Sequence, residues 1–448
     1  MEIIVTELSR YLIVILMALY TYWGFLAFAA KKKRRAKLCR KQRMVMYLFH
    51  FLGHLVLYLN TEDNMLWGLY GCEFAFFFVS NSIYKRVYGK ANRPVLNHMH
   101  MLFAISMVIL ARLDVNSAKK QFAYMLVGMV CCMVLPWILE RWKKLEKEGW
   151  FYAVLGLIIL IIVLLFGNAK YGAKNWLTIG PVVLQPSEFV KILFVFAFAS
   201  ILTQEKLDLR NIIKISIAAA MFVMILVLEK DLGAALIFFI CYLFMLYVAT
   251  GRARFLLAGF GSGSVAAVLG YFLFSHVRNR VVAWRDPWGT IDTQGYQVAQ
   301  SLFAIGTGGW FGMGLLQGMP TSIPIRESDF IFAAISEELG AFFGICMILV
   351  YVSCFVSFIS TAGNIQNPFY KLVVVGFSVI IMFQTFLTLG GVTKFIPSTG
   401  VTLPLVSYGG SSMLSVIVMF CTIQSISVIS GKEVENSVQK EKEAEEAQ

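Results

Sequence analysis

The segment RNRVVAWRDPWGTIDTQGYQVAQSLFAIGTGGWFGMGLLQGMPTSIPIRESDFIFAAISEELG, residues 278–340, separates two sets of apolar runs. It is polar, Gly-rich and charged, whereas the chain on both sides is a series of apolar runs of about 20 residues, the length that spans a bilayer. Long irregular loops are usually functional or disordered, and this one has too many aromatic and apolar residues for a disordered linker. The apolar runs therefore predict the fold, and this segment is the predicted working part.

The composition of the whole chain agrees with a membrane protein. Of its 448 residues, 58% are hydrophobic and 15% are charged, whereas a soluble protein of this length needs more polar surface. We predict an all-α polytopic membrane protein with no soluble domain, nucleotide motif or internal repeat. The predicted spans cover roughly residues 11–30, 44–60, 64–83, 98–113, 121–139, 150–167, 186–204, 212–229, 231–250, 255–275, 329–358, 371–390 and 404–430.

The distribution of positive charge predicts an orientation. The net charge is +13, but a dense basic cluster at 31–43 lies between two apolar runs, which is the pattern of a cytoplasmic loop and not of a nucleic-acid-binding arm. Alternate connections are basic, so we expect the N-terminus outside, the 276–328 loop outside and the C-terminus in the cytoplasm. The mixed-charge residues 431–448 are predicted to be a solvated cytoplasmic tail.

Cysteines and histidines give no metal signal in the sequence. The eight cysteines lie in apolar runs apart from Cys39, and none has CxxC spacing, so we predict neither a disulfide nor a zinc site. His50 and His54 are four residues apart and would share one helix face. The sequence offers no third ligand near them, so we predict packed histidines and no metal.

Charged residues within apolar runs are costly and mark function by default. Glu188 and Lys191 are three residues apart near the start of one run, so they can pair on one helix face, either as a structural ion pair or as part of a site. Asp231 opens another run, as a helix cap or as a second interior acid, and its position favours the cap.

The 278–340 segment contains three acids that compete for a chemical role. Asp286 and Asp292 occur in turn-forming sequences. Asp329 opens an apolar run at the predicted membrane–water boundary, where it either caps the helix or acts as a base on a substrate whose tail is in the lipid. The nearby Gly306-Thr307-Gly308-Gly309 lacks the ending of a phosphate-binding loop, and close backbone packing or a re-entrant turn explains it better.

Several motifs, in the same order over about residues 98–430, resemble the SEDS family of RodA, FtsW and SpoVE. The matching stretches are Gly172-Ala173-Lys174-Asn175-Trp176, Gln185-Pro186-Ser187-Glu188, Asp231-Leu232-Gly233, Gly295-Tyr296-Gln297 with Gln300-Ser301, Ser328-Asp329-Phe330-Ile331-Phe332, Glu337-Glu338-Leu339-Gly340, Pro397-Ser398-Thr399-Gly400, and Leu403-Pro404-Leu405-Val406-Ser407-Tyr408-Gly409-Gly410-Ser411-Ser412. Each motif alone is modest, and their shared order is specific.

The resemblance implies a ten-helix core in the bacterial plasma membrane that polymerises peptidoglycan from lipid II, by inverting hexosyl transfer, beside a class B penicillin-binding protein. Residues 98–430 would form this core, and residues 1–97 would add about three helices. The sequence assigns no cofactor and leaves a divalent cation open. The family's essential aspartate falls on Asp329. The implied substrate-binding residues are Lys120, Lys174, Trp176, Glu188, Lys191, Asp231 and Arg326.

Three points in the sequence stay open. The family's usual basic-Trp pair reads Asn175-Trp176 here, with Lys174 one position earlier. The interior charges also suit a lipid II flippase or another transporter of lipid-linked precursors, and a non-catalytic scaffold is a third reading. Elongation, division and sporulation proteins share these motifs, so the sequence does not assign the cellular role.

Overall fold

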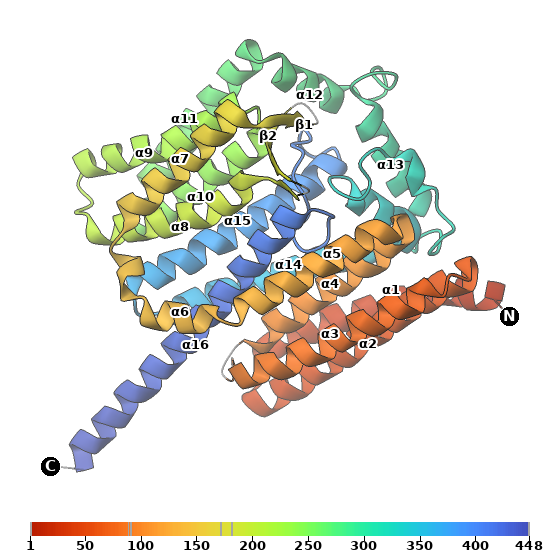
Figure 1. Cartoon of the computed structure of the whole chain (residues 1–448), viewed down its shortest axis with the longest axis horizontal. Helices are drawn as coiled ribbons and strands as arrows, with labels where there is room; N and C mark the ends of the chain where they lie inside the picture. Colours follow the sequence, from red (N-terminus) through yellow and green to blue (C-terminus); the bar gives the residue numbers. More distant parts are fainter. Residues whose placement is uncertain (1, 88, 90–91, 171–172, 181, 447–448) are drawn as a thin grey trace.

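The chain folds into a bundle of long helices (Figure 1) in the computed structural model, which describes residues 2–446 apart from 88, 90–91, 171–172 and 181. The helices are α1 (Glu2–Ala29), α2 (Lys32–Thr61), α3 (Met65–Val87), α4 (Arg93–Leu113), α5 (Val115–Cys132), α6 (Leu135–Arg141), η1 (Lys143–Glu146), α7 (Gly149–Phe166), α8 (Pro186–Gln204), α9 (Leu209–Leu228), α10 (Leu232–Thr250), α11 (Ala253–Leu273), α12 (Ser275–Arg285), α13 (Tyr296–Gly308), η2 (Pro320–Ser322), α14 (Ile331–Gly363), α15 (Pro368–Val392) and α16 (Gly410–Glu446).

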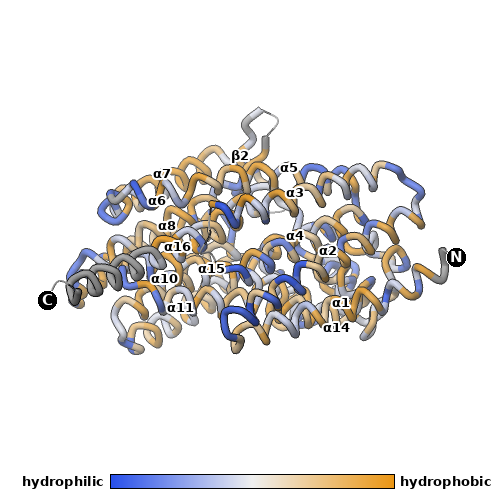
Figure 2. Tube along the Cα trace, turned by 90° about the horizontal axis from the view of Figure 1, so that it is seen from below, coloured by the Kyte–Doolittle hydropathy of each residue, from blue (hydrophilic) through white to orange (hydrophobic). Residues whose placement is uncertain are grey.

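The helix lengths confirm an all-α polytopic membrane fold. Among the described residues, 12 helical segments are long and apolar enough to cross a membrane, with α5 and α6 counted as one. Every predicted span falls on a helix, and α3 is the one whose sequence is too polar to join the 12. Hydrophobic residues make up most of the length of the long helices (Figure 2), as a lipid environment requires.

The two chain ends lie at opposite ends of the bundle. The N-terminus lies toward the end that carries α12 and α13, and the last turns of α16 project from the other end (Figure 1). The predicted tail therefore begins as a continuation of α16 up to Glu446, and its residues 447–448 lie outside the described part.

Helices α1 to α3 form a layer against the rest of the bundle. α1 packs on α2 and α14, and α2 packs on α4. The hydroxyl of the buried Tyr20 lies 3.1 Å from Nδ1 of His98, and the Phe49 ring stacks on Phe343 with 5.8 Å between centroids. These contacts join the N-terminal layer to α4 and α14, so the layer supports the helix that follows Asp329.

A small antiparallel sheet, absent from the predicted fold, connects α7 to α8. It contains β1 (Asn168–Lys170), β2 (Ala173–Ile179) and β3 (Val182–Leu184) in the order β1-β2-β3, with Leu177 opposite Leu184. The strands are too short and too mixed in composition to give an alternating pattern. Strand β2, which contains Asn175 and Trp176, lies toward the end of the bundle that carries α12 (Figure 1).

The segment around residues 278–340 is ordered, and its glycines pack against backbone. The amides of Met313 and Gly314 donate to the carbonyls of Glu337 and Glu338 at 2.9 Å each. At this point α14 is interrupted by Gly340, with φ 87° and ψ 164°. The Gly-rich stretch is therefore a close backbone contact with α14, as expected, and not a phosphate loop.

Gly312 provides a test of this packing. It has φ +80°, and a Cβ there would lie 2.2 Å from the Glu338 carbonyl oxygen. Alanine in Gly312→Ala would therefore be in a strained backbone conformation and would clash with this carbonyl. We expect a loss of about 1–3 kcal/mol of stability, measured as a lower melting temperature in detergent. The matched control is Gly306→Ala in α13, where a Cβ meets nothing within 4 Å, and it should leave the melting temperature unchanged or slightly raised. Equal effects of the two substitutions would contradict the packing.

Candidate active site

Asp329 lies two residues before α14, at the end of the long polar segment. The side chain does not cap the helix, since α14 begins after Phe330 without a side-chain cap. Instead Oδ1 accepts a hydrogen bond from the Ser328 hydroxyl at 3.0 Å. Burial raises the pKa of the Asp329 carboxyl, and the Ser328 bond and the Arg280 charge oppose this rise. The group is therefore a partly buried carboxyl that holds a proton more readily than a solvated aspartate.

Arg280, from α12, is the cation next to Asp329. Its Nη1 donates to the Ser398 carbonyl at 2.9 Å, which fixes the guanidinium over the loop between α15 and α16. Gly400 in that loop has φ +72°, and a Cβ built there would lie 3.5 Å from both Arg280 Nη2 and Asp329 Oδ2. A carboxyl and a guanidinium thus face the same small space above Gly400.

Asp231 is held beside this pair and serves as a helix cap. Its Oδ1 accepts from the Ala234 amide at 3.0 Å, as the sequence position favoured. Its Oδ2 accepts from Asn175 Nδ2 at 2.7 Å and from Gln185 Nε2 at 3.2 Å. The amide of Asn175 therefore joins the sheet to the start of α10. Asn175 occupies the position at which the SEDS family usually has a basic residue.

Glu229 lies two residues before Asp231 and is fully buried. Neither of its carboxyl oxygens has a hydrogen-bond partner among the described residues. Burial, with a smaller contribution from the Asp231 charge, raises its pKa to about 8. At neutral pH the carboxyl is therefore mostly protonated, as expected for an acid placed in an apolar site without a counter-charge.

A hydrogen-bond relay fixes the backbone under Asp329. The Ser407 hydroxyl donates to the Ser328 carbonyl at 2.6 Å, and Gln121 Nε2 donates to the Ser407 carbonyl at 2.8 Å. The amide of Tyr408 donates to the Glu327 carbonyl at 2.8 Å. The first turns of α5, the loop before α16 and residues 327–328 are thereby joined, so Asp329 rests on a rigid support.

Glu188 and Lys191 form the predicted ion pair inside the bundle. Lys191 Nζ lies 2.7 Å from Glu188 Oε1 and 3.0 Å from Gln384 Oε1, and Ser415 donates to Glu188 Oε2 at 2.9 Å. Lys191 is 1% exposed. The partners come from α8, α15 and α16, so this buried network joins three helices and has every charge paired.

The other predicted substrate-binding residues occupy more varied positions. Lys120 is exposed on α5, one residue before Gln121. Lys174 Nζ donates to the carbonyls of Leu164 and Leu165 at 2.9 and 3.2 Å, at the C-terminal end of α7. Side chains alternate along a strand, so Lys174 and Trp176 point away from the face on which Asn175 meets Asp231.

Arg326 and the two remaining acids lie in the polar segment itself. The partly buried Arg326 donates from Nη1 to the Thr321 carbonyl at 3.4 Å. Asp286 is exposed, and its Oδ1 accepts from the Gly289 amide at 2.9 Å, which is the turn that its sequence predicts. Asp292 is exposed as well. The structure therefore places Asp329, and not these two aspartates, in the buried polar cluster with Arg280, Asp231 and Glu229 (the Asp329 cluster).

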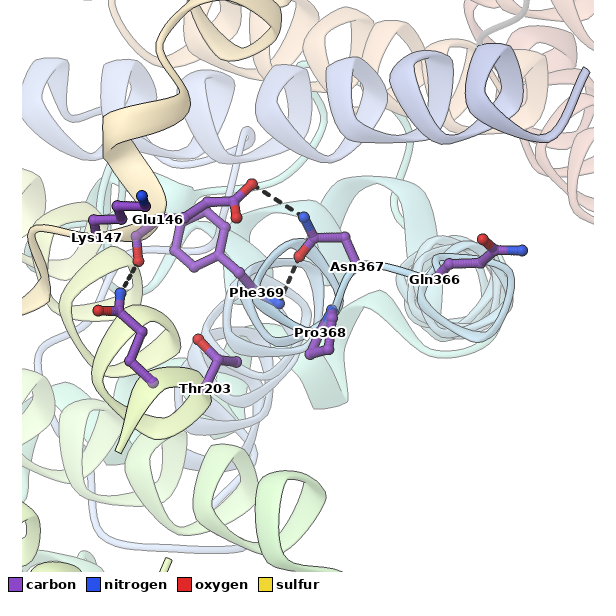
Figure 3. Close-up of a pocket in the computed structure, with 8 residues that line it drawn as sticks. Glu146, Lys147, Thr203, Gln366, Asn367, Pro368 and Phe369 are labelled. Carbon is purple, nitrogen blue, oxygen red and sulfur yellow. Dashed lines mark hydrogen bonds between the residues drawn. The ribbon is translucent and has the colours of Figure 1, made fainter. Parts of the chain in front are cut away.

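A shallow depression lies among the connections of η1, α8 and α15 (Figure 3). Its polar groups bind one another: Asn367 donates to Glu146 Oε1 at 3.0 Å, and the Gln204 amide contacts the Glu146 carbonyl. Asn367 also accepts from the Phe369 amide as the cap of α15. These bonds serve the helix ends, and none of the residues that line the depression belongs to the Asp329 cluster.

Comparison with known proteins decides the family. The model of the cell cycle protein family of FtsW, RodA and SpoVE matches residues 67–432, which is most of the chain. The chain belongs to this family. The match to the FtsW, RodA and SpoVE family begins within α3, earlier than the motifs noted from residue 98 onward.

Named relatives in the family cover most of the chain. The peptidoglycan glycosyltransferase RodA of Mycobacterium bovis is 32% identical over 408 residues, which are 84% of this chain and 87% of that relative. The probable peptidoglycan glycosyltransferase FtsW of Saccharophagus degradans is 33% identical over 66% of this chain and 79% of its own length. The stage V sporulation protein E of Bacillus subtilis is 30% identical over 69% and 86%.

Solved structures share the fold. A chain of a peptidoglycan synthase complex that coordinates polymerisation and crosslinking gives a TM-score of 0.67 at 22% identity, over 76% of this chain and 98% of that one. RodA of Thermus thermophilus gives 0.57 at 23% identity, over 75% and 96%. This member of the FtsW, RodA and SpoVE family therefore has residues beyond the shared fold.

Two residues of the cluster were absent from the predicted site. Arg280 belongs to the basic Arg278-Asn279-Arg280 stretch, which as a sequence reads as an ordinary flanking charge. Glu229 precedes a lysine and an aspartate and reads as part of a polar link. Arg280 reaches Asp329 only because α12 packs over the α15–α16 loop. Glu229 becomes a buried acid only because the turn between α9 and α10 is buried.

Proposed function

We propose that this chain is a peptidoglycan glycosyltransferase that polymerises lipid II, with the Asp329 carboxylate as its general base. Family membership and the names of the relatives support the activity: RodA and FtsW proteins are named as peptidoglycan glycosyltransferases. The observation that carries the assignment of the base is the position of Asp329, a partly buried carboxyl before a membrane helix, beside Arg280.

The reaction joins two lipid-linked disaccharides. The GlcNAc 4-hydroxyl of one molecule attacks the anomeric carbon of the other. A C–O bond forms on one face of that carbon, and the bond to the diphosphate breaks on the other. The hydroxyl proton passes to Asp329, and the undecaprenyl diphosphate leaves with the bonding electron pair. A positioned base contributes about 10²–10⁴-fold to such a step.

Cations support the reaction by stabilising the charge on the departing diphosphate. Arg280 is the best-placed cation because it is fixed by the Ser398 carbonyl next to Asp329. Lys120 and Arg326 are two further candidates, and Lys174 would have to leave the carbonyls of α7 to reach a phosphate. The substrate-binding set predicted from the sequence is retained as a proposal, with Arg280 added to it.

Reconstituted vesicles distinguish this function from its alternatives. Purified protein is placed in liposomes that contain labelled lipid II, and both polymer and transbilayer movement are recorded. We expect the wild-type protein to form glycan chains and Asp329→Asn to form none. The inactive variant also shows that no contaminating polymerase makes the product. Lipid movement without polymer would favour the flippase. Neither activity, with partner binding retained, would favour a scaffold and would overturn the proposal.

Arg280 gives a prediction with a pH readout. Asp329 must be deprotonated to act as a base, so activity should fall as pH decreases through its raised pKa. Arg280 favours the carboxylate form, and Arg280→Gln should therefore move this acid limb to higher pH besides lowering the maximal rate. Arg285→Gln, an exposed arginine on the same helix, is the control. An acid limb that stays in place in Arg280→Gln would show that the two side chains do not interact.

We propose an accessory role for residues 1–97, with residues 98–430 as the catalytic core and 431–448 as a tail. All proposed catalytic residues lie beyond α3. Because α1 and α2 pack on α14 and α4, a chain that begins near Lys90 should melt at a lower temperature yet keep its orientation and basal polymerisation. Cysteine accessibility, melting and the lipid II assay test this. A core that is folded and correctly oriented but inactive would show that residues 1–97 are required for catalysis and would contradict the accessory role.

The chain is a multi-pass membrane protein, and we propose the bacterial plasma membrane as its location, with the N-terminus outside and the C-terminus in the cytoplasm. The polymerase would work beside a class B penicillin-binding protein. The solved peptidoglycan synthase complex supports this partnership, because that assembly coordinates polymerisation with crosslinking and one of its chains shares this fold. Nucleic acid is not a partner in this proposal. Co-purification of such a protein with the tagged chain tests the partnership, and its failure in cross-linked membranes would contradict it.

A further inference from the structure

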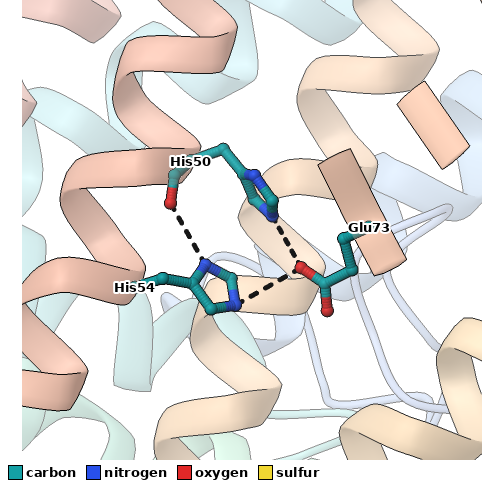
Figure 4. Close-up of side chains that lie close together, drawn as sticks. All are labelled: His50, His54 and Glu73. Carbon is teal, nitrogen blue, oxygen red and sulfur yellow. Dashed lines mark hydrogen bonds and ion pairs between the residues drawn. The ribbon is translucent and has the colours of Figure 1, made fainter. Parts of the chain in front are cut away.

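Three ligand-type side chains meet where α2 packs against α3. His50 and His54 are four residues apart and project from one face of α2, and Glu73 faces them from α3 (Figure 4). One potential ligand atom from each residue lies within 4.8 Å of the other two. All three side chains are 0% exposed. The sequence alone shows no third ligand because Glu73 comes from a different helix.

Glu73 occupies a position that packing alone would give to an apolar residue. The buried residues of α3 form one stripe along the helix: Leu66, Leu69, Glu73, Phe77, Ser80, Asn81 and Tyr84. The other faces of α3 carry exposed apolar side chains such as Phe74, Phe78 and Val79. A carboxylate in the middle of this buried stripe costs free energy unless a positive partner compensates it.

The hydrogen bonds identify the missing positive charge. His54 Nδ1 lies 3.1 Å from the His50 carbonyl oxygen, which can only accept, so Nδ1 carries the hydrogen. A neutral His54 then has a lone pair on Nε2, and this atom lies 3.3 Å from Glu73 Oε2. Two electron-rich atoms that face each other require a cation between them, which is either a proton or a metal ion.

Two more polar atoms of the cluster are without partners. His50 Nδ1 and Glu73 Oε1 are buried and have no hydrogen bond among the described residues. Aromatic rings close the site, with the Tyr70 ring stacked on His50 at 5.0 Å and the Phe77 ring edge-on at 5.2 Å between centroids. Such surroundings exclude bulk water, and the described residues pair no lysine or arginine with the carboxylate.

We propose that His50, His54 and Glu73 bind one divalent metal ion of the zinc class, which staples α3 to α2. Two imidazoles and one carboxylate form a ligand set that suits zinc, whereas calcium and magnesium take mainly oxygen ligands. The bond from His54 Nδ1 to a backbone carbonyl is the outer contact that metal-bound histidines commonly make.

The spacing fits this ion. Bonds of about 2.0–2.1 Å place two tetrahedral ligands roughly 3.3–3.4 Å apart, and the His54 Nε2 to Glu73 Oε2 distance is 3.3 Å. His50 Nε2 and Glu73 Oε2 lie 2.6 Å apart and share a hydrogen bond. The ion would take the place of this hydrogen, and the two atoms would move slightly apart. Water or the second carboxylate oxygen would complete the coordination.

Metal content tests the site without any use of polymerase activity, so its outcome is independent of the proposed function. The full chain, carrying an affinity tag without histidine, is stripped with chelator, incubated with Zn²⁺ or Co²⁺ and passed over a desalting column. We expect one ion per chain by mass spectrometry of the metal. We also expect visible cobalt absorption of the tetrahedral type, without the near-ultraviolet band of a cobalt–thiolate bond, because the nearby Cys72 is not a ligand.

Matched variants assign the ion to the three residues. Outer-sphere partners already contribute about 10–100-fold in affinity, so loss of a ligand in Glu73→Gln or His54→Gln should weaken binding at least that much. His100→Gln, which removes another buried histidine bonded to Ser80, should bind metal as the wild type does. Zn²⁺ should raise the melting temperature of the wild type and of His100→Gln, but not of Glu73→Gln.

The proposal fails if the wild-type chain takes up no Zn²⁺ and shows no cobalt spectrum, a result that needs no variant to fold. It also fails if folded Glu73→Gln and His54→Gln retain the metal content of the wild type. In either case the three side chains are a buried cluster that shares a proton.

Discussion

Asp329→Asn should abolish glycan formation while the protein remains folded in the membrane. Asparagine has the same shape and can still accept the Ser328 hydrogen bond through its carbonyl oxygen, so the local structure is kept. It has no basic lone pair at neutral pH, so the 4-hydroxyl would attack without proton removal. We expect a rate about 10²–10⁴-fold lower, measured with labelled lipid II and purified protein.

The folding control for this variant is straightforward. Melting temperature and gel filtration in detergent should match those of the wild type, because the Ser407 and Gln121 bonds that support residue 328 involve backbone atoms. A variant that loses activity and also melts much lower would leave Asp329 with a structural role and would contradict the assignment as a base.

The second large effect concerns the buried Glu188–Lys191 pair. Glu188→Gln or Lys191→Met removes one charge and leaves the other buried without compensation, which costs on the order of 3–5 kcal/mol. The Lys191 side chain is 1% exposed, so water cannot replace its partner. Each single variant should therefore express poorly or melt early, and the double variant Glu188→Gln/Lys191→Met should be milder than the sum of the two.

A double-mutant cycle on melting in detergent measures the coupling. Glu205→Gln at the exposed end of α8 is the matched control for loss of a carboxylate, and its effect should lie within about 0.5 kcal/mol of zero. Strict additivity of the Glu188 and Lys191 effects would contradict the 2.7 Å contact between them.

The sequence predicted most of the fold because apolar length is a strong local signal. Every predicted span lies on a helix, including the two that meet at the short link near residue 230. The β1–β3 sheet and the interruption of α14 at Gly340 were not predicted. Both depend on backbone contacts between segments far apart in the chain, such as that of Gly312 with Glu338, and such contacts leave no periodic pattern.

The candidate site was predicted in part. The ion pair of Glu188 with Lys191 and the cap role of Asp231 follow from spacing within one helix, and the structure confirms both geometries. The partner of Asp329 and the third member of the histidine cluster could not be predicted. Arg280 and Glu73 reach their neighbours only through the packing of helices that are distant in sequence.

One comparison tests the central claim most directly. The initial rate of glycan formation from labelled lipid II is measured side by side for Asp329→Asn, Asp286→Asn and Asp292→Asn, each purified and reconstituted at equal folded amounts. The three variants remove the same charge from one polar segment, but only Asp329 lies in the buried cluster. We expect Asp286→Asn and Asp292→Asn to keep rates near that of the wild type and Asp329→Asn to be inactive. A near wild-type rate for Asp329→Asn, or loss of activity in one of the other two variants instead, would contradict Asp329 as the base.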